Sequence, residues 1–358
     1  MALFHQMRIT DIRPETRNAV VLRLEPANGN MSDFNYAQGQ YITFKRDFDG
    51  EEIRRSYSIC SEVGAPFIEV GIKKVAGGLF SNWANESLKA GDLLEAMPPM
   101  GNFYTELKPS EGRHYLGFAG GSGITPFMSI IKTVLSREPQ SRFTLVYGNV
   151  SANSIMFREE LDDLKNLYMG RFNVLHILES DAMEVDLFHG RIDADKCKAL
   201  FKNWIDLKSV DQAFICGPEP MMKVISESLE GAGLPKEKIK FELFASPKPT
   251  KAGGKLKQAA VEEAKADVDL NVTIDGVTRS VSMHRNDLSI LEAGLAEGMD
   301  LPYACKGGVC ASCKCKVVEG DVDMEANFAL EDYEVEAGYV LSCQSYPVSD
   351  KVVVDYDQ

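Results

Sequence analysis

The sequence of 358 residues contains no apolar run that approaches the roughly 20 residues needed to cross a bilayer. Its first residues, MALFHQMRITDIRPET, lack the basic and then apolar layout of a secretory signal, and internal repeats are absent. These absences exclude a membrane-spanning chain and a repeat array. We therefore expect a cytoplasmic protein with no membrane partner and with two or three domains, because this length exceeds one ordinary core.

The chain also lacks an excess of basic residues, since its formal net charge is −14. From Ala266 to the end there are 18 Asp and Glu against 6 Lys and Arg, which is −12 and leaves −2 for residues 1–265. Nucleic acid is therefore an unexpected partner, because its phosphates need a basic face. The acidic C-terminal quarter suits docking to a basic patch on a protein, although acidity that only keeps a small domain soluble is the alternative.

Cysteine is scarce in the first 300 residues and concentrated after them. In a cytosolic chain such a cluster indicates metal ligation rather than disulfides. The spacing C-x4-C-x2-C, followed by one distant cysteine, matches a plant-type ferredoxin and predicts a [2Fe-2S] cluster. The loop between the ligands consists of small residues, which lets backbone amides face the sulfurs. The four predicted ligands are Cys305, Cys310, Cys313 and Cys343.

Two other metal sites fit this segment less well. A structural zinc site usually has two C-x2-C pairs, and here there is one, with no histidine after His284. A Rieske centre would require two histidine ligands, which are missing. Cys315 could compete as a ligand, but we interpret it as a small buried residue on the strand that follows the loop.

The order of predicted elements divides the chain into three parts. Short strands separated by Gly, Asn, Asp and Pro indicate an antiparallel barrel over residues 1–109, with strands at 20–26, 40–48, 53–60 and 67–74 and one helix near 79–88. Alternating apolar strands and helices indicate an α/β domain with a parallel sheet over 110–246, with helices at 127–138, 157–168 and 220–233. Residues 247–265, rich in Pro, Gly, Ala and Lys, are predicted to be a linker, flexible at its start and with a helix possible later. Residues 266–358 form the third domain.

Three short motifs carry candidate binding residues. Gly121, Gly123, Thr125 and Pro126 form a glycine turn between a strand and a helix, where a pyrophosphate can meet the helix N-terminus. An ordinary tight turn explains this motif equally well. Other candidates are the strand motif with Arg55, Tyr57 and Ser58, for which simple alternation is the alternative, and the helix start with Gly78 and Ser81, for which an N-cap is the alternative.

Taken together, these motifs resemble the ferredoxin-NADP reductase family. The resemblance rests on R-x-Y-S at 55–58, G-x-x-S at 78–81, G-x-G-x-x-P at 121–126 and Cys-Gly-Pro at 216–218, in this order. With the C-terminal plant-type ferredoxin, nearly the whole chain resembles the reductase subunits of bacterial oxygenases. The tail ALEDYEVEAGYVLSCQSYPVSDKVVVDYD is especially like that of reductases serving a ring-epoxidising oxygenase. The resemblance implies a flavin-binding barrel, a nucleotide-binding α/β domain and a β-grasp ferredoxin.

The resemblance also implies roles for individual residues. Arg55 would bind the flavin pyrophosphate, Tyr57 would stack on the flavin ring, and Ser58 would bond near its N5 atom. Gly78 and Ser81 would hold phosphate, and the 121–126 turn would bind the nicotinamide dinucleotide. Cys216 would lie at the nicotinamide, with a buried strand-end thiol as the alternative. Glu242 and Phe244 match the closing E-x-F segment of the family, in which the aromatic residue borders the flavin.

The form of the nicotinamide coenzyme is predicted from the residues after the second strand of the α/β domain. Enzymes that use NADH commonly place an acidic residue there to bond the ribose hydroxyls. Here the sequence continues Asn149-Val150-Ser151 and reaches no acid until Glu159. We therefore expect NADPH rather than NADH, with Ser151 and Arg158 as candidate contacts of the 2′-phosphate.

The expected function follows from the implied cofactors. A hydride brings two electrons, whereas a [2Fe-2S] cluster accepts one, and a flavin bridges the difference. We expect electrons to pass from NADPH through FAD and the cluster to the oxygenase component of a multicomponent monooxygenase. FMN remains an alternative to FAD. Rival functions are a reductase for a Rieske dioxygenase or a steroid hydroxylase, and a passive ferredoxin-type carrier.

Overall fold

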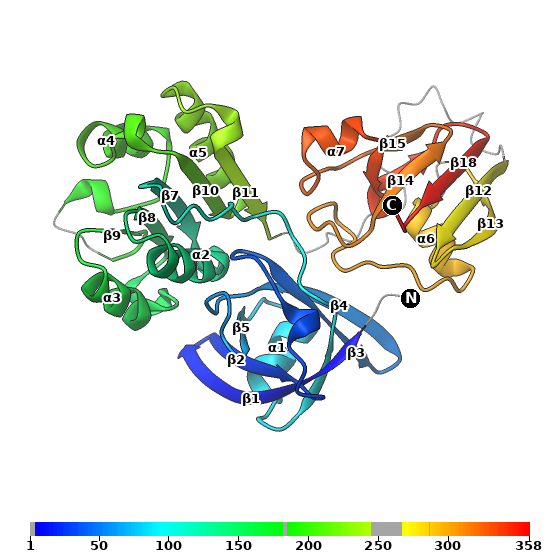
Figure 1. Cartoon of the computed structure of the whole chain (residues 1–358), viewed down its shortest axis with the longest axis horizontal. Helices are drawn as coiled ribbons and strands as arrows, with labels where there is room; N and C mark the ends of the chain where they lie inside the picture. The colour runs from blue at the N-terminus through cyan, green and yellow to red at the C-terminus, as the bar shows by residue number, and fades with distance from the viewer. Residues whose placement is uncertain (1–3, 182–184, 245–266, 286) are drawn as a thin grey trace. The chain divides into compact units, whose positions relative to one another are not determined.

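The computed structural model describes residues 4–181, 185–244, 267–285 and 287–358, so the predicted linker 247–265 lies outside the described residues. The described residues form three main sheets (Figure 1). Each sheet contributes side chains to at least one of three buried hydrophobic clusters. No helix in the described part of the chain has the length and apolar character required to cross a membrane.

The N-terminal sheet is antiparallel, with strand order β4-β3-β6-β1-β2-β5. An additional antiparallel bridge between Ile59 and Val70 links the chain just after β4 to β5, which joins the two ends of the sheet into a barrel. Helix α1 (Leu79–Glu86) contributes Phe80 and Ala84 to the barrel core. The strands are β1 (His5–Thr16), β2 (Ala19–Pro26), β3 (Tyr41–Phe48), β4 (Glu51–Ser58), β5 (Ile68–Lys73) and β6 (Leu93–Ala96).

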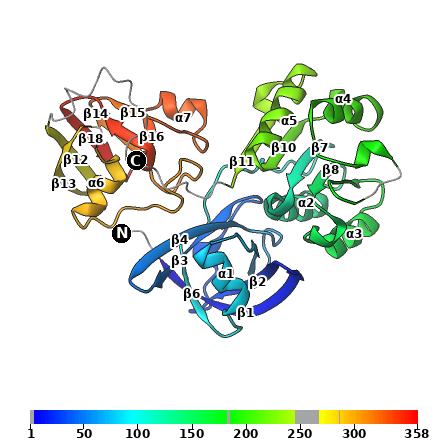
Figure 2. The same ribbon diagram turned by 180° about the vertical axis from the view of Figure 1, so that it is seen from behind.

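The second sheet is parallel throughout, with strand order β11-β10-β7-β8-β9. Its strands are β7 (His114–Gly120), β8 (Arg142–Asn149), β9 (Phe172–Leu178), β10 (Gln212–Gly217) and β11 (Ile239–Leu243). Helices α2 (Ile124–Arg137) and α3 (Arg158–Leu167) cover one face, and α4 (Ala194–Asn203) and α5 (Glu219–Gly231) cover the other (Figures 1 and 2). The chain leaves β7 toward β8 and later returns to β10, so the carboxyl ends of β7 and β10 form the switch point at which such sheets bind ligands.

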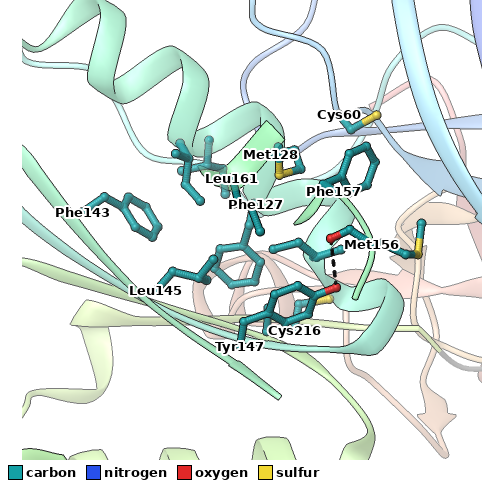
Figure 3. Close-up of a cluster of buried hydrophobic side chains, with 14 of the residues drawn as sticks. Cys60, Phe127, Met128, Phe143, Leu145, Tyr147, Met156, Phe157, Leu161 and Cys216 are labelled. Atoms are coloured by element: carbon teal, nitrogen blue, oxygen red, sulfur yellow. Dashed lines mark hydrogen bonds between the residues drawn. The ribbon is translucent and has the colours of Figure 1, made fainter. Parts of the chain in front are cut away.

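The barrel and the parallel sheet share a continuous core. Ala19, Val21 and Cys60 of the barrel belong to the same buried cluster as α2 and β8, and Figure 3 shows Cys60 among these side chains. Polar contacts reinforce the packing, because Lys132 Nζ donates to Cys60 O at 2.9 Å and Phe157 N donates to Glu15 Oε1 at 2.6 Å. The two sheets therefore belong to one compact unit.

The C-terminal sheet has strand order β13-β12-β18-β14-β16, with β12 and β18 parallel. Helix α6 (Ile290–Ala296) buries Ile290 and Leu291 in its core. Helix α7 (Asp332–Glu336) and a two-stranded sheet of β15 (Val322–Met324) and β17 (Ser345–Pro347) complete the domain. The main strands are β12 (Asp267–Ile274), β13 (Val277–His284), β14 (Lys314–Glu319), β16 (Tyr339–Leu341) and β18 (Lys351–Asp355).

The three-part fold class predicted from the sequence is confirmed, but several elements were not predicted. Strand β1 was missed because only Met7 and Ile9 of its twelve residues are buried, and its pairing with β2 is interrupted by two register shifts. A strand with so little alternation carries a weak period-2 signal. Strand β6 and helix α4 were also missing from the prediction. Helix α4 buries only Cys197 and Leu200.

Candidate functional site

The glycine turn after β7 lies in backbone contact with the end of β10. Gly121 has a positive φ of 55°, which favours glycine. A Cβ atom on Gly123 would lie 2.3 Å from the carbonyl oxygen of Cys216, and one on Gly120 would lie 2.8 Å from Pro218 Cδ. The structure therefore explains Gly123 by close packing of two turns. Any contact of this turn with a coenzyme phosphate remains a prediction.

Thr125 and Pro126 are both buried in the first turn of α2. The Thr125 hydroxyl donates to Ser122 O at 3.1 Å, within the same turn. Both residues thus shape the helix start, and the positive end of α2 lies directly after the glycines. Such a helix start favours a negatively charged phosphate group.

Gly123→Ala tests how far coenzyme binding depends on this packing. The added methyl group cannot fit beside Cys216 O, so the turn must move. We expect kcat/KM for the coenzyme to fall about tenfold or more, which is about 1.4 kcal/mol. Gly231→Ala is the control, since nothing lies within 4 Å of a Cβ there and its φ is not positive. Equal kinetics in the two variants would contradict the prediction.

Two buried polar side chains on β8 face the same turn. Tyr147 is fully buried and its hydroxyl donates to Gly121 O at 2.9 Å; its contact with Met156 O is drawn in Figure 3. Asn149 is 8% exposed, and its side chain interacts with the Tyr147 hydroxyl. The two polar side chains therefore form a pair beside the glycine turn.

Lys73 is a basic residue at this turn that the sequence motifs did not single out. It ends β5, and its Nζ lies 3.8 Å from the position that a Cβ on Gly121 would take. A lysine beside a helix N-terminus adds charge that an anionic group can meet. In the sequence, Lys73 and Lys74 form a basic pair just before the glycines of VAGG. Only the folded structure brings Lys73 close to Gly121.

On the barrel side, the three residues of the R-x-Y-S motif lie on β4. The Tyr57 ring is half-buried and packs against Phe80 and Phe44, at centroid distances of 5.6 and 6.1 Å. Arg55 Nη1 donates to Arg54 O at 2.7 Å. A partly exposed ring held by an aromatic core is suited to stack on a planar heterocycle.

Gly78 and Ser81 are in close contact at the start of α1. The Ser81 hydroxyl is buried and accepts a bond from Val75 N at 3.1 Å, and a Cβ on Gly78 would lie 2.7 Å from it. This arrangement explains both residues as parts of a turn. Their role as a phosphate seat stays a prediction.

Ser58, Cys216 and Glu242 meet where the barrel joins the parallel sheet. Ser58 Oγ donates to Glu242 Oε2 at 3.2 Å, and Cys216 and Glu242 are neighbours in the β10–β11 pairing. Glu242 keeps some exposed surface, yet burial of its carboxyl group raises its pKa from 4.5 to about 8. Burial, and to a lesser degree the neighbouring Glu242, raises the pKa of the Cys216 thiol well above its usual value. Both groups are thus neutral near pH 7.

Cys216 and Phe244 differ in access. Cys216 is fully buried in the core that Figure 3 shows, whereas Phe244 is 42% exposed, two residues beyond Glu242. Phe244 is the first residue after β11, the strand that carries Glu242. An exposed aromatic side chain there is consistent with a residue that covers a bound ring, which stays a prediction.

The loop after β8 contains the residues expected to bind a 2′-phosphate. Within it, Ser154 Oγ accepts from Ser151 N at 3.0 Å and donates to Ser151 O at 2.7 Å. Arg158 is exposed at the first position of α3. Ala152 N donates to Asp181 Oδ2 at 2.7 Å, so an acidic residue does lie against this loop. It comes from the chain after β9, which a search of the residues following β8 could not detect.

The four candidate cluster ligands converge in the C-terminal domain. Cys310 Sγ lies 3.1 Å from Cys305 Sγ, and Gly307 N donates to Cys305 Sγ at 3.3 Å. The Cys343 thiol interacts with those of both Cys305 and Cys313. Four thiols gathered from one loop and one distant turn, with an amide directed at sulfur, fit the ligand set of a [2Fe-2S] cluster.

Cys315 occupies a different environment from these four. It lies on β14, is 1% exposed and belongs to the hydrophobic core of the domain. Gly308 shapes the ligand loop instead: its φ is 73°, and a Cβ there would lie 2.7 Å from Ala326 O. The buried position of Cys315 favours a role in packing. That Cys315 does not bind the cluster stays a prediction.

The fold and these sites define a nicotinamide-dependent flavin and iron–sulfur oxidoreductase. Sequence models of three domain families match the chain: the oxidoreductase FAD-binding domain at residues 6–104, the oxidoreductase NAD-binding domain at 118–227 and the 2Fe-2S iron-sulfur cluster binding domain at 272–348. The cofactors are therefore FAD, a nicotinamide dinucleotide and a [2Fe-2S] cluster.

Similar proteins narrow the class further. The chain is 42% identical to one of the subunits of the 1,2-phenylacetyl-CoA epoxidase of Escherichia coli (strain K12), over 100% of this chain and 99% of that protein. It is 33% identical to the ferredoxin reductase component of 3-ketosteroid-9-alpha-monooxygenase from Rhodococcus rhodochrous, over 90% and 88% of the two chains. The structure of phthalate dioxygenase reductase shares the fold, with a TM-score of 0.61 and 20% identity over 98% of each chain. This chain belongs to the family of FAD-, NAD- and [2Fe-2S]-binding reductase components of oxygenase systems.

Proposed function

We propose that this chain supplies electrons to a di-iron oxygenase that epoxidises the aromatic ring of phenylacetyl-CoA, in phenylacetate catabolism. The 42% identity over the full length supports this choice, as does the C-terminal tail that first indicated a ring-epoxidising system. A steroid hydroxylase is the second candidate, favoured by the 33% identity to a 3-ketosteroid monooxygenase reductase component. A Rieske dioxygenase is the third. The family assignment leaves no role for a passive carrier.

The observation that carries the reductase mechanism is the contact of Ser58 with Glu242. It joins a residue of the flavin-binding barrel to the carboxyl edge of the nucleotide-binding sheet, beside Cys216. A flavin held by these residues would supply the chemistry that converts a two-electron hydride into the single electrons that a [2Fe-2S] cluster accepts. We place the flavin-binding, nucleotide-binding and cluster-binding domains at residues 1–109, 110–246 and 266–358.

The residues of this chain have separate tasks in that site. Tyr57 presents its ring as a stacking surface, and Arg55 supplies a positive charge for the flavin pyrophosphate. Gly121, Gly123 and Lys73 form the seat of the coenzyme pyrophosphate. Glu242 holds a proton on its carboxyl group near pH 7, with Ser58 bonded to it. A group that holds a proton at this position would stabilise negative charge on a bound flavin.

The remaining tasks fall to residues around this centre. Gly78 and Ser81 would offer the start of α1 to a flavin phosphate, and the exposed Phe244 side chain would cover the flavin ring. Cys216 is fully buried on β10 and would keep a neutral thiol next to Glu242. Cys305, Cys310, Cys313 and Cys343 hold the cluster.

A reconstituted system tests the assignment of the partner. The purified chain is combined with the di-iron oxygenase component from the same cell, phenylacetyl-CoA and reduced coenzyme, and ring epoxide formation is followed by mass spectrometry. We expect turnover that depends on this chain. Turnover with a steroid hydroxylase or a Rieske dioxygenase, and none with the di-iron component, would instead identify one of the alternatives.

The acidity of the C-terminal domain predicts how this partner is recognised. Its charge of −12 should attract a basic surface of the oxygenase, and salt screens such attraction. We expect electron transfer to the oxygenase to slow as ionic strength rises past about 0.1 M, where the Debye length falls below about 10 Å. Stopped-flow kinetics over a salt series measure this. Rates independent of salt would show that the acidity serves solubility alone.

A further inference from the structure

The residue that follows the distant cysteine ligand is a buried glutamine. Gln344 is 6% exposed and ends the short 3-10 turn Ser342–Gln344, which contains Cys343. Its side-chain Nε2 donates to Lys306 O at 3.1 Å and to Cys343 O at 3.0 Å. Both hydrogens of the amide group are thereby used. One of the two bonds joins the turn that carries Cys343 to the loop that carries the other three ligands.

The bond to Lys306 fixes the orientation of one peptide group. The carbonyl group of Lys306 and the N–H of Gly307 belong to the same planar trans peptide and point in opposite directions. Gly307 N donates to Cys305 Sγ at 3.3 Å. While Gln344 holds the carbonyl group on one side of this peptide, the N–H on the other side stays directed at the ligand sulfur.

Lys306 depends on this bond because its backbone has an unfavourable conformation. Its φ is 51°, in the left-handed region that residues with a Cβ atom seldom adopt. Gln344 is kept within reach by its surroundings, because its backbone O accepts from Glu325 N at 2.9 Å and its Cγ lies 3.1 Å from the position of a Cβ on Gly308. Without the bond, a return of Lys306 to negative φ would turn the Gly307 N–H away from the sulfur.

From these contacts we propose that Gln344 is a positioning residue that raises the reduction potential of the cluster through the peptide between Lys306 and Gly307. An added electron increases the negative charge on the cluster and its thiolates, and an N–H directed at a thiolate sulfur favours that reduced form. Gln344 thus makes electron transfer from flavin to cluster more favourable. The inference rests on the reductase function proposed above and on its four cysteine ligands.

Gln344→Met tests this role, since methionine keeps the length of the side chain and removes both donated bonds. The potential of the cluster in the holoprotein is measured by chemical redox titration followed by electron paramagnetic resonance, with no coenzyme or oxygenase present. We expect the equilibrium constant for electron transfer from flavin to cluster to fall about tenfold, which is about 59 mV in the cluster potential. The g values of the reduced cluster should also change.

The matched control is Asn271→Leu, which removes a half-buried amide from β12 of the same domain. The Asn271 side chain accepts from Ser280 Oγ at 2.6 Å and belongs to the β12–β13 pair. This variant should keep the wild-type potential and g values.

A second background separates orientation of the peptide from simple packing. In Lys306→Gly the left-handed backbone costs little, because glycine adopts positive φ readily, so the peptide needs the glutamine less. We expect Gln344→Met to lower the potential less in this background than in wild type, each compared with its own parent. If Gln344→Met alone fails to retain the cluster, Lys306→Gly should restore it, as measured by iron and sulfide content.

Three results would overturn the proposal: an unchanged potential with unchanged g values in Gln344→Met, an equal shift in both backgrounds, or loss of the cluster in both. Each would reduce Gln344 to a packing residue. Failure of the proposed function is a different result, because a wild-type chain with no [2Fe-2S] signal after reduction would contradict the ligand set itself, and this proposal with it.

Discussion

Cys343→Ala is expected to abolish the [2Fe-2S] absorption bands and electron transfer to a one-electron protein acceptor, while leaving reduction of the flavin by the coenzyme intact. The thiol of Cys343 meets those of Cys305 and Cys313, so its loss removes one of four converging ligands. Arg55, Tyr57 and Glu242 belong to other sheets and are unaffected by this change. The electron path should therefore be cut after the flavin.

The measurement has two parts. A dye that takes electrons directly from flavin should be reduced at more than about half the wild-type rate, whereas reduction of the protein acceptor should fall about 100-fold or more. Loss of both activities in a variant that still binds flavin would show that the two centres do not act in series.

Cys315→Ala is the matched control, since it removes a thiol from the same domain. This side chain packs in the core of that domain, 1% exposed, so its truncation should cost about 1 kcal/mol of stability and leave both activities in place. A normal cluster in Cys343→Ala, or its loss in Cys315→Ala, would reverse the assignment of the two cysteines.

Glu242→Gln is expected to slow flavin reduction by the coenzyme about 100-fold at pH 7, the scale typical of a group that supplies or holds a proton in a reaction. The carboxyl group has a pKa of about 8 because it is buried, so it carries its proton at pH 7 with Ser58 bonded to it. Glutamine keeps the shape and neutrality of this group but has no proton to give. A rate within about twofold of wild type would restrict Glu242 to a structural role.

The pH profile supplies a second readout that a structural role would not move. In wild type, flavin reduction should decline as pH rises through about 8, because the carboxyl group then ionises. In Glu242→Gln the decline should disappear. Glu237→Gln, on the short turn before β11, serves as the control and should keep the wild-type profile.

The same group affects stability, with a sign that follows from its raised pKa. Between about pH 4.5 and 8 the folded state keeps a proton that the unfolded state has lost, so stability decreases as pH rises through this window. Below that window both states are protonated and the contribution is constant. Denaturant unfolding should show a shallower decline with pH in Glu242→Gln than in wild type.

The sequence by itself determined the features that depend on neighbouring residues. The C-x4-C-x2-C spacing predicted a ferredoxin domain because three ligands come from one loop. Alternating apolar strands and helices predicted the parallel sheet, because its strands are buried on both faces. The helix near residues 79–88 and the glycine turn at 121–123 were also predicted from the sequence. Helical periodicity and turn chemistry depend on residues only a few positions apart.

Only the tertiary structure decided which distant groups share an environment. Ser58 and Glu242 are 184 residues apart, yet their contact and the raised pKa of Glu242 depend on the barrel packing against the parallel sheet. Gly123 is a packing residue because Cys216 O lies where its Cβ would be. Asp181 reaches the loop after β8 because β8 and β9 are neighbours in register. Electrostatic and packing energies depend on distance in space, and sequence spacing does not report that distance once the chain has folded back on itself.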